Sequence, residues 1–339
     1  MQKKFPKIVQ IAIISLYLIF LAGAVVRMTG SGMGCPDWPK CFGYYIPPTS
    51  EDQIIWKPNT TFKEGSIIVK SEELYVAQQN INTGSEFNPS KWEKYTKHDY
   101  ATFNTFHTWT EYINRLVSVL AGFVFLFLIY GAYKLRNTDK RIPILAFLAF
   151  ILLLFEAWLG KTVVDSNLSP TKITIHMVVG LVIIALLLGL KYIISNHKTF
   201  PYNSLFNKLL IVSVIFSLVQ IAMGTQVRQF IDEQVKLFGF DNKNYSLMNP
   251  SFKFYFHRSF TIAIVLVNLG LFYINQTKSL GYKLVNWILV LIGLETITGI
   301  LMYYAEFPLG TQAIHLLSGA ILFGLQFYLW LQSRKTVTN

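Results

Sequence analysis

Long apolar runs dominate the pattern of hydrophobic and polar positions along this chain. Eight segments are mostly apolar over about twenty residues, the length that a helix needs to cross the hydrocarbon core of a bilayer. Short polar stretches separate most of them. The sequence therefore predicts an all-α polytopic membrane protein with eight transmembrane helices, at residues 8–27, 110–133, 143–164, 173–194, 207–228, 255–275, 284–303 and 311–332.

Positive charge sets the expected orientation, because loops rich in lysine and arginine stay cytoplasmic. We therefore expect both termini to be cytoplasmic and the protein to lie in the cell (inner) membrane. The net charge of +12 largely reflects this pattern, and no concentrated basic tract predicts a nucleic-acid partner. The basic residues on this side are Lys3, Lys4, Lys7, Lys134, Arg136, Lys140, Arg141, Lys191, Lys198, Lys208, Lys278, Lys283, Arg334 and Lys335.

One long loop, residues 28–106, is expected on the extracytoplasmic side after the first helix. Its sequence IIVKSEELYVA, residues 67–77, predicts a strand, so a small β-rich region is expected there. Cys35 and Cys41 are the only cysteines of the chain, and in an oxidising compartment they favour a disulfide. Both a structural and a redox-active disulfide fit this pattern.

The chain also contains an internal repeat that predicts two pseudo-symmetric four-helix bundles, residues 1–200 with the long loop and residues 201–339. Both halves begin on the same side, so the repeat axis should follow the membrane normal. In each half a glutamate precedes a histidine by twenty residues. The repeated pairs are Gly23–Arg27 with Gly224–Arg228, Asn114–Arg115 with His257–Arg258, Glu156–Gly160 with Glu295–Gly299, and His176–Gly180 with His315–Gly319.

Four histidines, His107, His176, His257 and His315, each lie near the start of a predicted helix on one face of the membrane. Ionisable side chains inside a membrane are costly and mark functional sites. Two imidazoles from opposed helices, such as His257 and His315, are suited to the iron of a haem. Interfacial hydrogen bonding at helix N-termini is the alternative, and the repetition favours haem. The arginines expected near haem propionates are Arg27, Arg115, Arg228 and Arg258.

The first half departs from this symmetry. Asn114 stands where the second half has His257, and His107, Glu111 and Asn114 share one helical face at spacings of four and three residues. A carboxylate on a bundle-facing stripe can move protons, so Glu111 is the predicted catalytic residue. The alternative is that Glu111 forms an ion pair with Arg115, four residues later.

These motifs together resemble the heme A synthase family. The resemblance rests on RMTGSGMGCPDWPKCFG at 27–43, EYINRL at 111–116, the block from Gly160 to His176, His257-Arg258, and the block from Pro308 to His315. It covers nearly all of the predicted transmembrane part and leaves out residues 44–100.

The resemblance implies an oxidoreductase that oxidises the C8 methyl of heme O to a formyl group, giving heme A for aa3-type oxidases, with water as the oxygen source. It also implies that His257 and His315 ligate a permanent heme b in the second half. Substrate haem would lie in the first half, beside His176 and a catalytic Glu111. A membrane quinone or another acceptor would take the electrons, and heme O synthase is a further expected partner.

Asn114 departs from the family pattern, which has histidine there, so the second ligand of the substrate haem stays open. The haem could sit higher, His107 could ligate it through local unwinding, or His176 could be the single protein ligand; we favour the His107–His176 pair. For Glu156 and Glu295, a proton path and a hydrogen bond to the neighbouring helix are equally favoured. The competing functions are a diheme b-type electron-transfer protein, quinol oxidoreductase-like, and a haem carrier that needs no Glu111.

Overall fold

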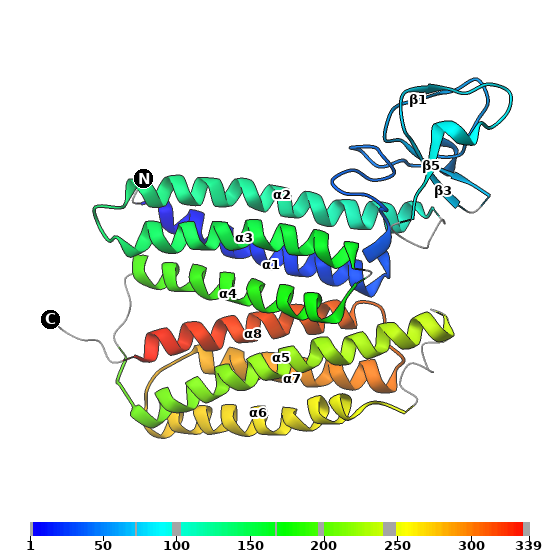
Figure 1. Cartoon of the computed structure of the whole chain (residues 1–339). Coiled ribbons are helices and arrows are strands. Elements are labelled where there is room, and N and C mark those ends of the chain that lie inside the picture. Colours follow the sequence, from blue (N-terminus) through cyan, green and yellow to red (C-terminus); the bar gives the residue numbers. More distant parts are fainter. Residues whose placement is uncertain are drawn as a thin grey trace.

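The computed structural model describes residues 3–71, 73–96, 103–166, 168–195, 200–239 and 249–334. Within these residues, eight helices are long and apolar enough to cross a membrane, which confirms the predicted number. Lys198 and Lys335, which contribute to the expected charge pattern, lie outside the described residues. The helices are α1 Phe5–Met28, α2 Thr105–Lys134, α3 Arg141–Asp165, α4 Pro170–Ile194, α5 Ser204–Phe238, α6 Phe252–Thr277, α7 Leu284–Tyr304 and α8 Thr311–Ser333 (Figure 1).

Local sequence signals explain several helix ends. The side chains of Asn104 and Asn203 accept hydrogen bonds from the backbone at the starts of α2 and α5, and Pro170 occupies the first turn of α4. The predicted end of α5 at residue 228 was wrong, because the helix continues to Phe238. Beyond residue 228, an ion pair from Arg228 to Asp232 spans one helical turn, and Gly239 with φ 87° follows the last residue.

The eight helices form two four-helix groups, α1–α4 and α5–α8, as the repeat predicted (Figure 1). In each group the first helix contacts the second and the fourth, and the third contacts the fourth. Between the groups, α1 meets α8, α4 meets α5, and α4 meets α8. The repeat relates α1 to α5 and α4 to α8. Exchanging the halves therefore turns the α1–α8 contact into the α5–α4 contact and leaves the α4–α8 contact unchanged, so a pseudo-two-fold axis passes between α4 and α8. The domain boundary at residue 200 stays a prediction, because residues 196–199 lie outside the described part.

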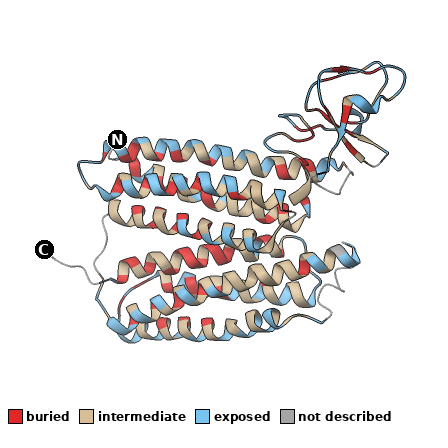
Figure 2. Ribbon diagram, viewed as in Figure 1, coloured by how far each residue is buried: buried red, intermediate tan, exposed pale blue. Residues whose placement is uncertain are grey.

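Buried residues lie along the lengths of the packed helices (Figure 2). Many of the exposed side chains on the helices are also large and apolar. Helix α8, which contacts both groups, has the largest buried share of the eight helices: 50% of the residues in an 18-residue stretch of it are buried. Outward side chains such as Phe127, 66% exposed, and Leu266, 63% exposed, would be unfavourable in water. A bilayer supplies the apolar surroundings that this surface requires.

The long loop after α1 folds into a small β-rich region, as expected. Its strands are β1 Thr61–Phe62, β2 Ile67–Lys70, β3 Glu73–Ala77, β4 Ile81–Asn82 and β5 Trp92–Lys94. They form an antiparallel three-stranded sheet in the order β2-β3-β5 and an antiparallel β1-β4 pair. The single strand predicted over residues 67–77 was wrong: it is a hairpin that pairs Lys70 with Glu73. Ser71, at φ 51°, cannot continue an extended strand.

The beginning of this loop packs directly on α2. The hydroxyl of Thr108 donates to the carbonyl of Gly34 at 2.8 Å, and the indole of Trp109 donates to the carbonyl of Pro48 at 3.2 Å. A Cβ at Gly34 would lie 2.4 Å from the carbonyl oxygen of His107 and 2.8 Å from the nitrogen of Thr108. Only glycine allows the loop and helix backbones to come this close.

We expect Gly34→Ala to separate the loop from α2, because the added methyl group meets backbone atoms that cannot turn away. The unfolding free energy should fall by about 1–3 kcal/mol, and the loop should become more accessible to protease. Gly32→Ala is the control, since its Cβ would meet side-chain atoms and no backbone: Leu168 at 3.4 Å and Val26 at 3.9 Å. Equal melting temperatures and protease sensitivity for the two purified variants would contradict this view of the contact.

Candidate functional site

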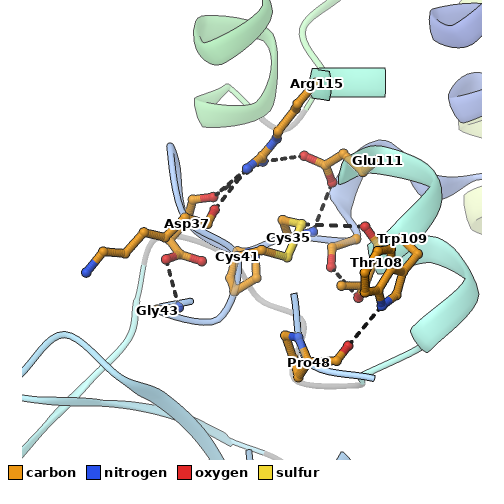
Figure 3. Close-up of a disulfide and its surroundings, with 12 residues drawn as sticks. Cys35, Asp37, Cys41, Gly43, Pro48, Thr108, Trp109, Glu111 and Arg115 are labelled. Atoms are coloured by element: carbon orange, nitrogen blue, oxygen red, sulfur yellow. Dashed lines mark hydrogen bonds and ion pairs between the residues drawn. A yellow bond between two sulfur atoms is a disulfide. The ribbon is translucent and has the colours of Figure 1, made fainter. Parts of the chain in front are cut away.

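The predicted catalytic residue Glu111 lies between the disulfide loop and its own helix (Figure 3). Its side chain is 5% exposed. Oε2 accepts a hydrogen bond from the backbone nitrogen of Cys35 at 2.9 Å, and Oε1 pairs with the guanidinium of Arg115 at 2.5 Å. Cys35 and Cys41 form the predicted disulfide, with Cα atoms 4.8 Å apart. The disulfide therefore places a backbone donor directly on the buried carboxylate.

Arg115 connects this carboxylate to the loop. Besides Glu111, it donates to the carbonyl of Lys40 at 2.9 Å and to the carbonyl of Asp37 at 3.3 Å (Figure 3). The ion pair that the sequence offered as an alternative for Glu111 is thus present. Its presence leaves the catalytic role a prediction, because a paired carboxylate still accepts protons. Arg115 directs its donors toward the loop, and its role as a propionate ligand also stays a prediction.

Asp37 is a buried carboxyl group in the same loop. Its Oδ2 accepts from the backbone nitrogen of Gly43 at 2.9 Å, whereas Oδ1 is buried and has no hydrogen-bond partner among the described residues. Gly43 adopts φ 81°, which glycine tolerates. Burial raises the pKa of Asp37 above its ordinary value of 3.8, although the bond from Gly43 and the charge of Arg115 act in the opposite direction.

His107 lies one turn before Glu111 on α2. Its Nδ1 hydrogen bonds with the hydroxyl of Ser31 at 2.9 Å, and Ser31 in turn contacts the hydroxyl of Thr29 at 2.6 Å. Nε2 is the ring nitrogen that this contact leaves for a ligand. Within the described residues, no hydrogen bond or ring contact joins His107 to His176, so pairing of these two histidines on one iron stays a prediction.

The second half brings His257 of α6 and His315 of α8 together. Their ring centroids lie 6.3 Å apart, with ring planes at 72°. Two imidazoles that bind one metal from opposite sides through nitrogens at about 2 Å would place their ring centres about 6 Å apart. His257 Nδ1 is buried and has no hydrogen-bond partner in the described part of the chain. These residues therefore fit a bis-histidine haem.

Small and polar residues surround this histidine pair. Gly224 of α5 leaves room for the His257 ring, since a Cβ there would lie 3.1 Å from Cε1. Gln220, one turn earlier, donates to the carbonyl oxygen of His257 at 2.9 Å and to the hydroxyl of Thr261 at 3.0 Å. In this half the repeated glycine, Gly224, therefore makes room for a ring that a larger side chain would crowd.

The glutamates of the repeat contact the histidines that follow them by twenty residues. Glu156 of α3 touches Nδ1 of His176 on α4, and Glu295 of α7 lies 3.2 Å from Nδ1 of His315 on α8. Glu295 also accepts from the hydroxyl of Ser318 on α8. A hydrogen bond to the neighbouring helix is therefore present for Glu295, through Ser318, whereas Glu156 makes an ion-pair contact with His176. A proton path through these glutamates stays a prediction.

Two of the predicted propionate arginines meet at a residue that the sequence had not singled out. Asp232 of α5 accepts from Arg27 of α1 at 2.9 Å and pairs with Arg228 at 2.7 Å. Arg228 also donates to Gln312 at 2.6 Å and to the carbonyl of Arg27 at 3.0 Å. The spacing of four residues between Arg228 and Asp232 was the available signal. Arg27 and Arg228, which occupy equivalent positions in the repeat, thus contact each other and share Asp232 across the interface between the halves.

Other contacts could be anticipated only in part. Arg258 packs over the rings of Phe254 and Tyr255, with the guanidinium carbon 6.0 and 5.3 Å from their centroids. Thr298 and Ser318, which contact the Glu295–His315 pair, each follow one member of that pair by three residues. This spacing puts them on the same helical face and would have been the signal for them.

These features define an eight-helix membrane protein of two pseudo-symmetric halves, with polar and histidine-containing clusters near one end of the helices. The profile of the cytochrome oxidase assembly protein family, COX15-CtaA, matches residues 7–65 and 64–327. Because these segments include nearly the whole chain, the protein belongs to this family.

Several relatives are similar over almost their full length. The heme A synthase of Shewanella oneidensis is 23% identical over 378 aligned residues, covering 97% of this chain and 98% of that protein. The heme A synthase of Alkalihalophilus pseudofirmus is 24% identical and covers 97% of both chains. The heme A synthase of Ehrlichia canis is 25% identical, covering 93% of this chain and 89% of that protein.

We expect Asp37→Asn to stabilise the protein near neutral pH, because the folded state must otherwise bury an ionised carboxylate. The folded-state pKa is raised, so wild-type stability should fall as pH rises from 3.8 through that pKa. The variant's higher melting temperature should therefore vanish below pH 3.8. Asp52→Asn is the control, since the Asp52 side chain is 78% exposed. A pH-independent difference between Asp37→Asn and wild type would contradict the assignment.

Proposed function

We propose that this protein converts heme O to heme A by oxidising the C8 methyl group of the porphyrin to a formyl group. The observation that carries the proposal is the buried carboxylate of Glu111, held by Cys35 and Arg115 in the half that has Asn114 in place of a repeat histidine. The three relatives are named heme A synthase, which supports heme A as the product.

The proposed reaction has a defined balance of atoms and electrons. A methyl group and one water give a formyl group, four protons and four electrons, so water supplies the oxygen and an electron acceptor of the quinone class is needed. Glu111 accepts hydrogen bonds at both oxygens, and it can take up protons that the substrate and water release. Cys35 and Arg115 keep this carboxylate in place during the transfer.

The second half has the residues to hold a resident heme b. His257 and His315 would hold its iron, and when bound this haem would supply one-electron transfer away from the substrate pocket. In the first half, His176 would bind the iron of the substrate heme O, with His107 as the second ligand. Arg27, Arg115, Arg228 and Arg258 would serve propionates of the two haems, and the loop disulfide would be either structural or redox-active.

The same proposal includes the location and partners of the protein. The protein would lie in the cell (inner) membrane. The side of the helix bundle that is rich in lysine and arginine, with both termini, would face the cytoplasm. Heme O synthase would supply the substrate. A diheme electron-transfer protein that leaves haem unmodified is not supported, because the three relatives above are named for heme A synthesis.

Replacement of Glu111 by glutamine tests the central claim. Glutamine keeps an acceptor for the nitrogen of Cys35 but removes the proton-accepting carboxylate, so turnover should fall about 100-fold or more. Pigments extracted from cells that express the variant should contain heme O in place of heme A, while the b-type haem of the purified protein persists. Glu64→Gln, at an exposed loop position, is the control. A normal heme A yield from Glu111→Gln would show that the Glu111 carboxylate is not needed for the reaction.

Replacement of His107 tests whether it ligates the substrate iron. If it does, His107→Ala loaded with heme O should change from a six-coordinate to a five-coordinate absorption spectrum, with the b-type haem unchanged. Ser31→Ala is the matched variant, because it removes the hydrogen-bond partner of His107 and leaves the imidazole in place. Intact heme O binding and turnover in His107→Ala would exclude this ligand. Equal defects in both variants would show that His107 acts by anchoring the loop.

A further inference from the structure

The two glutamate–histidine pairs of the repeat differ in what surrounds them. In the second half, Thr298 Oγ1 lies 2.9 Å from Nδ1 of His315, and the same hydroxyl lies 2.8 Å from the carbonyl oxygen of Leu294. A hydroxyl has one proton, so donation to Leu294 leaves its oxygen to accept from Nδ1–H. Nδ1 is thereby engaged, and Nε2 is the nitrogen of His315 left for a metal.

The carboxylate of this pair is held as well. Ser318 of α8 donates to Oε1 of Glu295, while Oε2 lies 3.2 Å from Nδ1 of His315. Thr298 and Ser318 are both 4% exposed. The pair is therefore connected on both sides by buried hydroxyl groups, one from the helix of the glutamate and one from the helix of the histidine. Such connections restrict rotation of the imidazole.

The first half lacks both hydroxyl groups. Leu159 occupies the position that corresponds to Thr298, and Val179 the position that corresponds to Ser318. The Glu156 carboxylate contacts Nδ1 of His176 directly, and Glu156 Oε1 is buried with no partner among the described residues. The His176 side chain is 39% exposed, against 25% for His315. At these two positions the glutamate–histidine contact of the first half therefore has no hydroxyl group to support it, and its imidazole is more exposed.

We propose that Thr298 and Ser318 are positioning residues that lock His315 for permanent ligation, and that their absence at Leu159 and Val179 leaves His176 free to release its ligand. The inference rests on the proposed function, because it assigns one kept haem and one exchanged haem to the two halves. Hydrogen bonds to the outer nitrogen of a ligating histidine fix the ring and raise its basicity, and their loss costs about 10–100-fold in metal affinity.

The test for the second half measures haem retention in the purified whole protein. Haem transfer from the double variant Thr298→Val, Ser318→Ala to excess apomyoglobin should be about 10–100-fold faster than from wild type. The midpoint potential of the remaining b-type haem should shift to more positive values, because its ligand becomes less basic. The single variant Thr298→Ser keeps both hydroxyl groups, so its haem transfer rate and midpoint potential should equal those of wild type. Thr296→Val is the control, since among the described residues the Thr296 hydroxyl bonds only the carbonyl of Ile292 on its own helix.

The test for the first half adds a hydroxyl where none is present. Val179→Thr preserves side-chain shape, and it should slow the release of heme O from loaded protein to apomyoglobin. Unchanged transfer rates and potential in the double variant, with a normal haem content, would overturn the inference and leave the proposed function standing. If heme O leaves Val179→Thr as fast as it leaves wild type, the part of the inference that concerns His176 is overturned. If the wild-type protein binds no b-type haem, the inference and the resident haem of the proposed function are both overturned.

Discussion

A polar side chain inside a bilayer has no water to bind, so it must find a partner within the protein. This requirement places the polar groups of α7 and α8 against one another, through Glu295, His315 and Ser318. Deeper in the second half, Ser217 of α5 donates to Gln326 of α8 at 2.6 Å. Each contact joins two helices, so satisfying the polar groups also determines how the helices are rotated about their axes.

The same requirement explains how the two halves meet. Arg27 and Arg228 occupy equivalent positions in the repeat, and both bind Asp232. One carboxylate can pair with two guanidinium groups only when the helix ends that carry them lie close together, as the ends of α1 and α5 do here. The pseudo-symmetry of the fold therefore shows itself in the interface as well as within each half. Only α5 carries the acidic residue, so this cluster breaks the symmetry that its arginines follow.

The helical part of the fold could be predicted because hydropathy over about twenty residues reflects one dominant constraint, the thickness of the bilayer. The prediction was wrong where that constraint ends. Beyond Arg228 the helix α5 continues through polar residues to Phe238, held by contacts within one turn. The hairpin over residues 67–77 was missed because a turn at Ser71 depends on backbone conformation, which a run of strand-forming residues does not reveal.

The sequence by itself determined the eight apolar segments, the repeat, and the residue types of the site, because these follow from composition and spacing. Spacing along one helix also indicated the contact between Glu111 and Arg115. Only the tertiary structure decided that the nitrogen of Cys35 binds Glu111, and that hydroxyl groups hold His315 but not His176. Those contacts join segments far apart in the chain, and their existence depends on how the helices and the loop pack together.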